Sequence, residues 1–152
     1  MKALSIRQPG AFCITHGPCR IEDRPWPTRF RGWFLIHTGK TYRTGMEHYI
    51  HAHSPSINIV EMQRSPRGGI VGIARLVDCI EIPLTIDRWE RVGARIRPEQ
   101  RVWTGTRCGP YAFLLEDVHP LPYLVPYPGR FNFFDVTGPT LRIIKDLLEK
   151  AA

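Results

Sequence analysis

The segment from Arg7 to Lys40 contains the residues of this chain that are best suited to chemistry. Its 34 positions hold six basic side chains together with Gln8, Glu22 and Trp26. Glycines and prolines separate these residues, which places polar groups at strand ends and turns rather than along a helix face. Guanidinium groups bind phosphate bidentately, and an indole ring offers a stacking face for a base. The segment therefore favours a shallow cleft for an anionic, partly aromatic ligand such as a nucleotide.

Two pairs of polar residues in this segment have alternative interpretations. Arg7 and Gln8 lie where an expected first strand meets Pro9. There the glutamine can bind a base edge and the arginine a phosphate, or both can form a solvated strand end. Glu22 and Arg24 are two positions apart in an extended segment, so they share one side of it. They could bind a base edge and a phosphate, or form a salt bridge within the fold.

Further cationic and aromatic residues are candidates for contacts with nucleic acid. Arg31 adds a cation, and Trp26, which lies between two prolines, is a stacking candidate. Trp33 belongs to an apolar run and is expected in the core. Tyr111, at the start of a later expected strand, offers a second stacking ring.

His37 and Lys40 follow an expected buried strand and are the candidates for catalysis. A histidine titrates near neutral pH and can act as a general acid or base, and a lysine can stabilise charge that develops on a phosphoryl group. Glu22 is an alternative base. The competing interpretation is that His37 is a structural residue at a strand end, with its hydrogen bonds satisfied inside the protein.

No metal or cofactor site is expected. His48, His51 and His53 are close in sequence, but no carboxylate or cysteine completes a recognised metal-binding pattern, which favours a polar helix face. Neither a Walker loop nor a GxGxxG motif is present. The four cysteines lack CxxC spacing and are expected to be reduced and partly buried; they are Cys13, Cys19, Cys79 and Cys108.

The chain has 152 residues and a formal net charge of +7, and residues 1–50 alone carry +5 of this charge. This balance favours a polyanionic partner. Arginine makes up 17 of the 21 basic residues, however, and GC-rich coding would produce the same bias. The length suits a single domain over residues 1–152. Because no apolar run is long enough to span a bilayer and no signal-peptide core follows Met1, we expect a soluble, cytoplasmic protein without membrane contact.

The pattern of apolar and turn residues predicts an α+β fold with about six short strands and a few peripheral helices, arranged as a small, partly open mixed β-barrel. Pro120–Pro128 is expected to be a proline-rich connection. The expected strands are Lys2–Arg7, Arg20–Arg24, Gly32–His37, Gly68–Glu81, Tyr111–Val118 and Arg130–Val136. The expected helices are Gly10–His16, Tyr42–Arg64 split by Pro55, Asp87–Arg95 and a C-terminal helix over about 139–150.

The order of short motifs along the chain resembles the ASCH domain family of the PUA-like superfamily. The resemblance covers roughly residues 3–136 and implies a PUA-like barrel with a cleft at one end and an association with RNA. One branch of the family resembles enzymes that deacetylate N4-acetylcytidine, and some members resemble ribonucleases acting on single-stranded RNA. The motifs are Leu4-Ser5-Ile6-Arg7-Gln8-Pro9, Gly17 to Thr28 with Ile21, Glu22, Arg24 and Trp26, Arg31-Gly32, Ile36-His37-x-Gly39-Lys40, Gly69-Ile70-Val71-Gly72 and Tyr111-Ala112-Phe113.

The sequence departs from the family pattern at several positions. Cys19 occupies the position of the signature lysine, and Glu22 that of a nearby threonine, which disfavours amidohydrolase chemistry because cysteine has neither the charge nor the reach of lysine. Gly10 stands where the family has an aromatic residue.

The leading hypothesis is a binding module for single-stranded RNA or for a modified nucleoside within it. A ribonuclease on single-stranded RNA is the main alternative. An interaction module of the coactivator kind, with a basic face for an acidic partner, is a further alternative. The residues expected at the site are Arg7, Gln8, Glu22, Arg24, Trp26, Arg31, His37, Lys40 and Tyr111.

Overall fold

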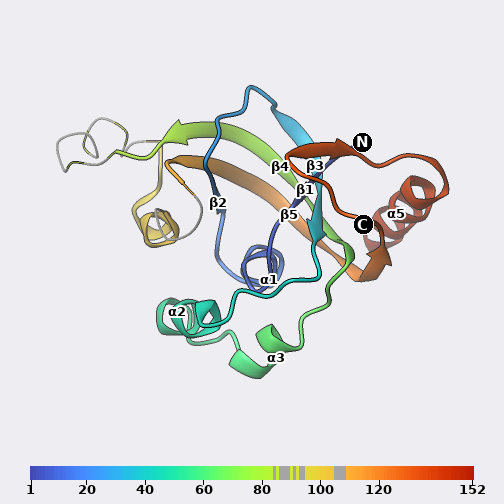
Figure 1. The fold of residues 1–152 in the computed structure, drawn as a ribbon, viewed down its shortest axis with the longest axis horizontal. Coiled ribbons are helices and arrows are strands. Elements are labelled where there is room, and N and C mark those ends of the chain that lie inside the picture. The colour runs from blue at the N-terminus through green and yellow to red at the C-terminus, as the bar shows by residue number, and fades with distance from the viewer. Residues whose placement is uncertain (84, 86–89, 91, 93–94, 105–108) are drawn as a thin grey trace. The chain divides into compact units, whose positions relative to one another are not determined.

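The computed structural model describes residues 1–83, 85, 90, 92, 95–104 and 109–152. Its strands form a mixed six-stranded sheet with the strand order β2-β5-β4-β3-β1-β6 (Figure 1). β1 pairs parallel with β3 and antiparallel with β6, and β2 pairs antiparallel with β5. The strands are β1 Lys2–Ser5, β2 Ile21–Arg24, β3 Gly32–Thr38, β4 Gly69–Glu81, β5 Tyr111–Pro126 and β6 Phe133–Asp135.

The α+β class and the six strands agree with the sequence prediction. Among the described residues β2 and β6 form the two ends of the strand order, so the sheet is open and is not a closed barrel. Two compact units make up the chain. That residues 1–152 form one domain stays a prediction. None of the helices in the described ranges is both long and apolar enough to cross a bilayer.

The helices also follow local sequence signals. α1 covers Gly10–His16 between Pro9 and Gly17, as predicted. The expected helical stretch Tyr42–Arg64 forms two short helices on either side of Pro55. The expected helix Asp87–Arg95 falls largely outside the described residues. The remaining bounds are α2 Met46–His53, α3 Ile59–Gln63, the 3-10 helix η1 Pro98–Trp103 and α5 Gly138–Ala151.

The prediction of a connection over Pro120–Pro128 is wrong, because β5 continues to Pro126. The positions of Pro120, Pro122 and Pro126 differ from one another by even numbers. Hydrogen-bonding direction alternates along a strand, so the three missing N–H groups face the same edge and the opposite edge can still pair with β4. The sequence prediction treated the prolines as strand breakers and did not take their even spacing into account. The last strand, β6, is shorter than the expected Arg130–Val136.

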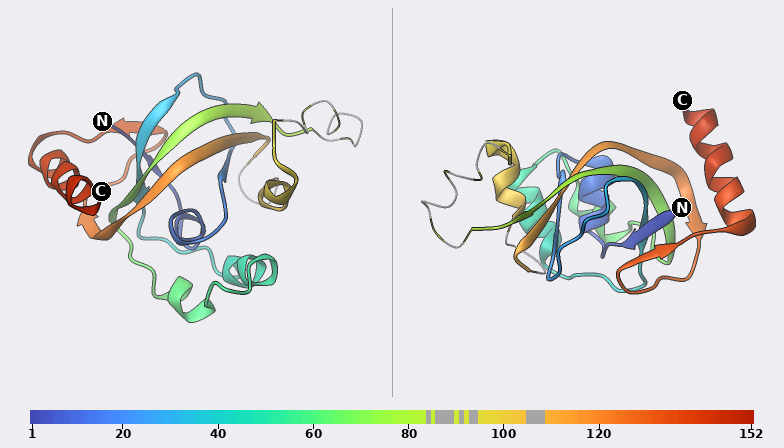
Figure 2. Two further views of the ribbon diagram at one scale, coloured as in Figure 1. Left: turned by 180° about the vertical axis from the view of Figure 1, so that it is seen from behind. Right: turned by 90° about the horizontal axis from the view of Figure 1, so that it is seen from above.

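The first unit consists of residues 1–18, 33–74 and 118–152. Its apolar core lies where α5 packs beside the start of β1 (Figure 2). Alternation along the strands supplies most of the core, and the 3.6-residue period of α5 adds Ile144, with Leu141 and Leu148 packed at the margin. The buried members are Ala3, Leu35, Ile70, Ile73, Leu121, Val125, Phe134, Val136 and Ile144.

The second unit consists of residues 19–32 and 75–117. β2 pairs with the first residues of β5, so that Arg24 lies opposite Tyr111 and Glu22 opposite Phe113. Trp103 in η1 is buried, and the Arg20 backbone N–H donates to the Gln100 side-chain carbonyl at 2.7 Å.

Candidate functional site

Gln8 is the structural centre of the candidate residues in the first unit. Its side chain is 1% exposed. The amide oxygen accepts a hydrogen bond from the Phe12 backbone N–H at 2.8 Å, and the amide nitrogen donates to the Pro66 carbonyl at 3.0 Å. Because the first N–H groups of a helix have no partner within it, Gln8 satisfies one of those of α1. It thereby joins α1 to the segment that follows α3.

The backbone of Gln8 contacts a second segment of the chain that carries cationic residues. Gln8 forms a parallel bridge with Tyr42, and its carbonyl accepts from the Arg43 N–H at 2.8 Å. These contacts place the backbone of Arg7 beside the segment that begins at Lys40, and the bond to Pro66 adds the segment that carries Arg64 and Arg67. We call Arg7, Lys40, Arg64 and Arg67 the basic cluster.

All four side chains of the basic cluster are exposed. Within the part of the chain that the structure describes, none of the four forms an ion pair. Their charge is therefore open to an anionic ligand.

Arg67 of the basic cluster contacts Tyr42, which is hydrogen-bonded to Glu47. The Arg67 guanidinium carbon lies 4.5 Å from the centre of the Tyr42 ring, and the Tyr42 hydroxyl donates to the Glu47 carboxylate at 3.2 Å. Glu47 is buried and also accepts from the Gly45 N–H at 3.0 Å. Burial, followed by the charge of Glu47, raises the pKa of Tyr42 to about 12. Although burial opposes it, hydrogen bonding from the backbone and from Gln63, Tyr42 and Gly45 lowers the pKa of Glu47, which keeps its carboxylate ionised.

His37 is buried in β3 with both ring nitrogens in hydrogen bonds. Its Nε2 lies 2.8 Å from the Tyr127 carbonyl and its Nδ1 lies 2.9 Å from the Ser5 hydroxyl. A carbonyl only accepts, so Nε2 carries the proton and Nδ1 accepts from Ser5. Burial lowers the pKa of His37, although the bond to Tyr127 opposes this, and the ring stays neutral. These contacts match the structural interpretation of His37.

In the second unit, Glu22 and Arg24 form a largely buried ion pair of 3.3 Å. The Arg24 guanidinium lies 6.0 Å from the centre of the Trp26 ring, and the edge of that ring packs against Phe113 at 5.3 Å between centroids. Tyr111 lies opposite Arg24 in the strand register. These residues therefore pack together as one group. Glu22 and Arg24 form the salt bridge within the fold that was the alternative to binding a base edge and a phosphate.

Arg31 is also held by groups of its own unit. It donates to the carbonyls of Thr28 and Phe30 at 3.0 and 2.8 Å, and it lies 3.5 Å from the Asp78 carboxylate. Asp78 in turn binds Arg95 through contacts as short as 2.7 Å. The charge of Arg31 is thus partly neutralised by an acid 47 residues away in sequence.

The cysteine and histidine candidates have internal contacts. Cys19, at the position of the family lysine, is buried and its thiol donates to the Ile21 carbonyl at 3.2 Å. His51 and His53 bind the carbonyls of Ile57 and Tyr49. Among the described residues, no three histidine, cysteine, aspartate or glutamate side chains gather as a metal ion would require.

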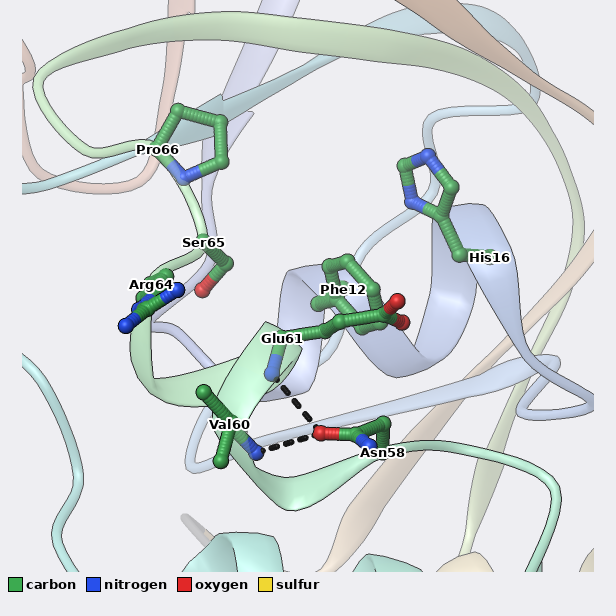
Figure 3. Close-up of a pocket in the computed structure, with 8 residues that line it drawn as sticks. All are labelled: Phe12, His16, Asn58, Val60, Glu61, Arg64, Ser65 and Pro66. Carbon is green, nitrogen blue, oxygen red and sulfur yellow. Dashed lines mark hydrogen bonds between the residues drawn. The ribbon is translucent and has the colours of Figure 1, made fainter.

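A shallow hollow of about 620 Å³ lies between α1 and the α3 segment (Figure 3). It adjoins the basic cluster, because Arg64 and Pro66 belong to its wall. We call it the α1–α3 hollow. Sequence analysis missed it, and also missed Arg64, Arg67 and Tyr42, since no local motif marks residues that meet through Gln8. Its lining residues are Phe12, His16, Asn58, Val60, Glu61, Arg64, Ser65 and Pro66.

Comparison with solved structures identifies the fold. A crystal structure of a single-residue mutant of the ASCH protein of Zymomonas mobilis superposes with a TM-score of 0.55, at 15% identity, over 96% of both chains. The chain has the ASCH fold. A second mutant of that protein and a further crystal structure of it give TM-scores of 0.54 and 0.53, each at 15% identity over 96% of this chain and 94% of the other. The resemblance to ASCH domains in the motif order is thus confirmed at the level of the fold. No protein-family model and no curated protein sequence matches the chain.

Proposed function

We propose that this protein is a binding module for single-stranded RNA and that the basic cluster binds the RNA backbone. The observation that carries the proposal is the state of the four cations Arg7, Lys40, Arg64 and Arg67. They are exposed, they lie on backbone segments that Gln8 joins, and among the described residues they have no carboxylate partner. Phosphate contacts of this kind release counterions from the nucleic acid and supply most of its sequence-independent affinity.

The arginines of the second unit support this choice by contrast. Arg24 is paired with Glu22, and Arg31 with Asp78. A phosphate that binds either arginine must compete with a carboxylate already in place, whereas the basic cluster requires no such exchange. The Arg67 guanidinium also lies over the Tyr42 ring and donates to the Gln63 carbonyl at 2.9 Å, so it loses less conformational freedom on binding.

The contacts of His37 favour a binding role over ribonuclease chemistry. A general acid or base must exchange a proton with the substrate, and both nitrogens of this buried ring already bond to Ser5 and Tyr127. Cys19 likewise donates its thiol hydrogen to the backbone. These contacts give no support to catalysis at His37.

The test measures binding of a labelled single-stranded RNA by fluorescence anisotropy over a range of salt concentrations. Lys40→Ala and Arg67→Ala should each weaken binding and reduce the slope of log K against log salt by about 0.7 for every phosphate that the variant no longer neutralises. Arg31→Ala and Arg142→Ala serve as charge-matched controls and should leave the slope close to that of the wild type.

Equal losses in all four variants would indicate attraction by net charge alone and would overturn the proposed site. Equal affinity for heparin and RNA would favour the interaction-module alternative. Cleavage of the RNA that disappears in His37→Ala would instead show an enzyme.

A further inference from the structure

The α1–α3 hollow has the size and composition of a site for one nucleobase. Its volume of about 620 Å³ falls within the range of about 300–1,000 Å³ that is usual for small-ligand pockets. Aromatic side chains come from α1, polar ones from Asn58 and Glu61, and a cation from Arg64 (Figure 3). Specific recognition of RNA usually combines these elements, with bases stacked on aromatic rings and hydrogen-bonded through their edges.

The aromatic wall is a stacked pair of rings. The rings of Phe12 and His16 stack with centroids 4.6 Å apart and an angle of 15°. The Thr15 hydroxyl donates to the Ala11 carbonyl at 2.9 Å, so it accepts from His16 Nδ1 at 2.8 Å. This leaves His16 Nε2 as a hydrogen-bond acceptor. Burial lowers the pKa of His16, against the opposing charge of Glu61, and the imidazole stays neutral at pH 7.

The polar wall offers a carboxylate beside an amide. The Glu61 side chain extends from α3 toward α1, and its charge acts on His16 (Figure 3). The Asn58 amide oxygen accepts from the N–H groups of Val60 and Glu61 at 2.8 and 3.2 Å. Its two N–H donors make no hydrogen bond among the described residues. Apart from the Arg64 guanidinium, the hollow therefore presents mainly acceptors, from Glu61 and His16, with the Asn58 amide as a further donor.

This arrangement of donors and acceptors distinguishes the four bases. Guanine has two adjacent donors, N1–H and N2–H₂, which match the two oxygens of a carboxylate, and beside them O6, which matches an amide donor. Adenine and cytosine place a ring nitrogen lone pair next to their amino group, and uracil flanks its single N–H with two carbonyls. Each of these three bases would direct a lone pair at a carboxylate oxygen, and such an unpaired contact costs affinity.

We propose that the α1–α3 hollow binds an unpaired guanine base, with Glu61 reading its N1–H and N2–H₂ edge and Arg64 binding an adjoining phosphate. The proposal rests on RNA binding by the basic cluster, which shares Arg64 with the hollow. It adds base preference to a site whose phosphate contacts alone carry none.

The experiment compares oligouridine RNAs that contain one central guanine, one central adenine or neither, with the full chain in an anisotropy titration. The wild type should bind the guanine oligonucleotide roughly 5- to 150-fold more tightly than the adenine one, the range of one good bidentate base contact. Glu61→Gln removes one acceptor and should reduce that ratio to within about threefold, with uridine binding unchanged. Glu149→Gln, an exposed carboxylate of α5, is the matched control and should keep the wild-type ratio.

The outcomes separate this proposal from the proposed function. Tight, salt-dependent binding of all three RNAs with equal affinity would overturn the guanine site and leave RNA binding intact. A guanine preference that survives Glu61→Gln would also overturn it. Absence of binding to every oligonucleotide at low salt would refute the proposed function. An independent test titrates the protein with GMP and with AMP and monitors the NMR signals of His16. GMP should perturb these signals more than AMP does. Equal perturbation by the two nucleotides would contradict the guanine site.

Discussion

Replacement of Gln8 tests whether its two side-chain hydrogen bonds stabilise the first unit. The buried amide satisfies the Phe12 N–H at the start of α1 and the Pro66 carbonyl after α3, 58 residues away in sequence. Gln8→Ala removes both bonds and leaves the Phe12 N–H without its acceptor. The Pro66 carbonyl is less affected because it also accepts from the Thr38 hydroxyl at 3.2 Å.

The expected loss of stability follows from these contacts. Removal of a helix-capping acceptor costs about 0.5–2 kcal/mol. The second, neutral hydrogen bond contributes about 0.5–1.5 kcal/mol. Gln8→Ala should therefore lower the free energy of unfolding by about 1–3.5 kcal/mol. Gln8→Glu keeps an acceptor for Phe12 but directs a carboxylate at the Pro66 carbonyl, so it should also destabilise the protein at pH 7.

Urea unfolding followed by circular dichroism measures both variants against the wild type. The deficit of Gln8→Glu should shrink as the pH falls toward 4, because a protonated carboxyl regains a donor for Pro66. A Gln8→Ala variant within 0.5 kcal/mol of the wild type would refute the structural role of this amide. A Gln8→Glu deficit that does not change with pH would refute the assigned donor and acceptor roles.

Two further predictions concern His37. Burial lowers its folded-state pKa below the usual 6.5, so the unfolded chain binds the extra proton first. The free energy of unfolding should therefore fall as the pH drops below about 6.5, by up to about 1.4 kcal/mol per pH unit. Urea unfolding between pH 7.5 and 5.5 should show a smaller fall in His37→Gln than in the wild type, and an equal fall in both would contradict this. Gly129→Ala would place its Cβ 2.6 Å from His37 Cε1 and should destabilise the protein by about 1–3 kcal/mol, whereas a thermal midpoint equal to that of the wild type would show that the ring can move aside.

The elements that sequence analysis located correctly are those with local signals. α1 is bounded by Pro9 and Gly17, and the β-branched run over 69–81 forms a single long strand. The split near Pro55 also follows from one residue. In each case the conformational preference of a few neighbouring residues decides the structure, because no distant contact opposes it.

The candidate site was less accessible to sequence because it depends on pairing between distant residues. The net charge of residues 1–50 indicated a basic face, and Arg7 and Lys40 are exposed there as expected. Arg31 looked equivalent to them in sequence, but Asp78 lies against it in the fold. A count of charges along the chain cannot tell a neutralised arginine from an open one.

The position of Gln8 has a consequence for how stability and binding are linked. The same amide holds Phe12, in one wall of the α1–α3 hollow, and Pro66, in the other, while its backbone bridges to the segment of the basic cluster. Local unfolding that breaks the hydrogen bonds of Gln8 would separate the two walls of the hollow and, at the same time, the segments that carry the basic cluster. Conversely, a ligand that contacts both Arg64 and the α1 aromatic wall binds only the closed arrangement and stabilises it by mass action. RNA binding should therefore protect the Phe12 amide from hydrogen exchange, although in the proposed complex Phe12 contacts RNA only through its side chain.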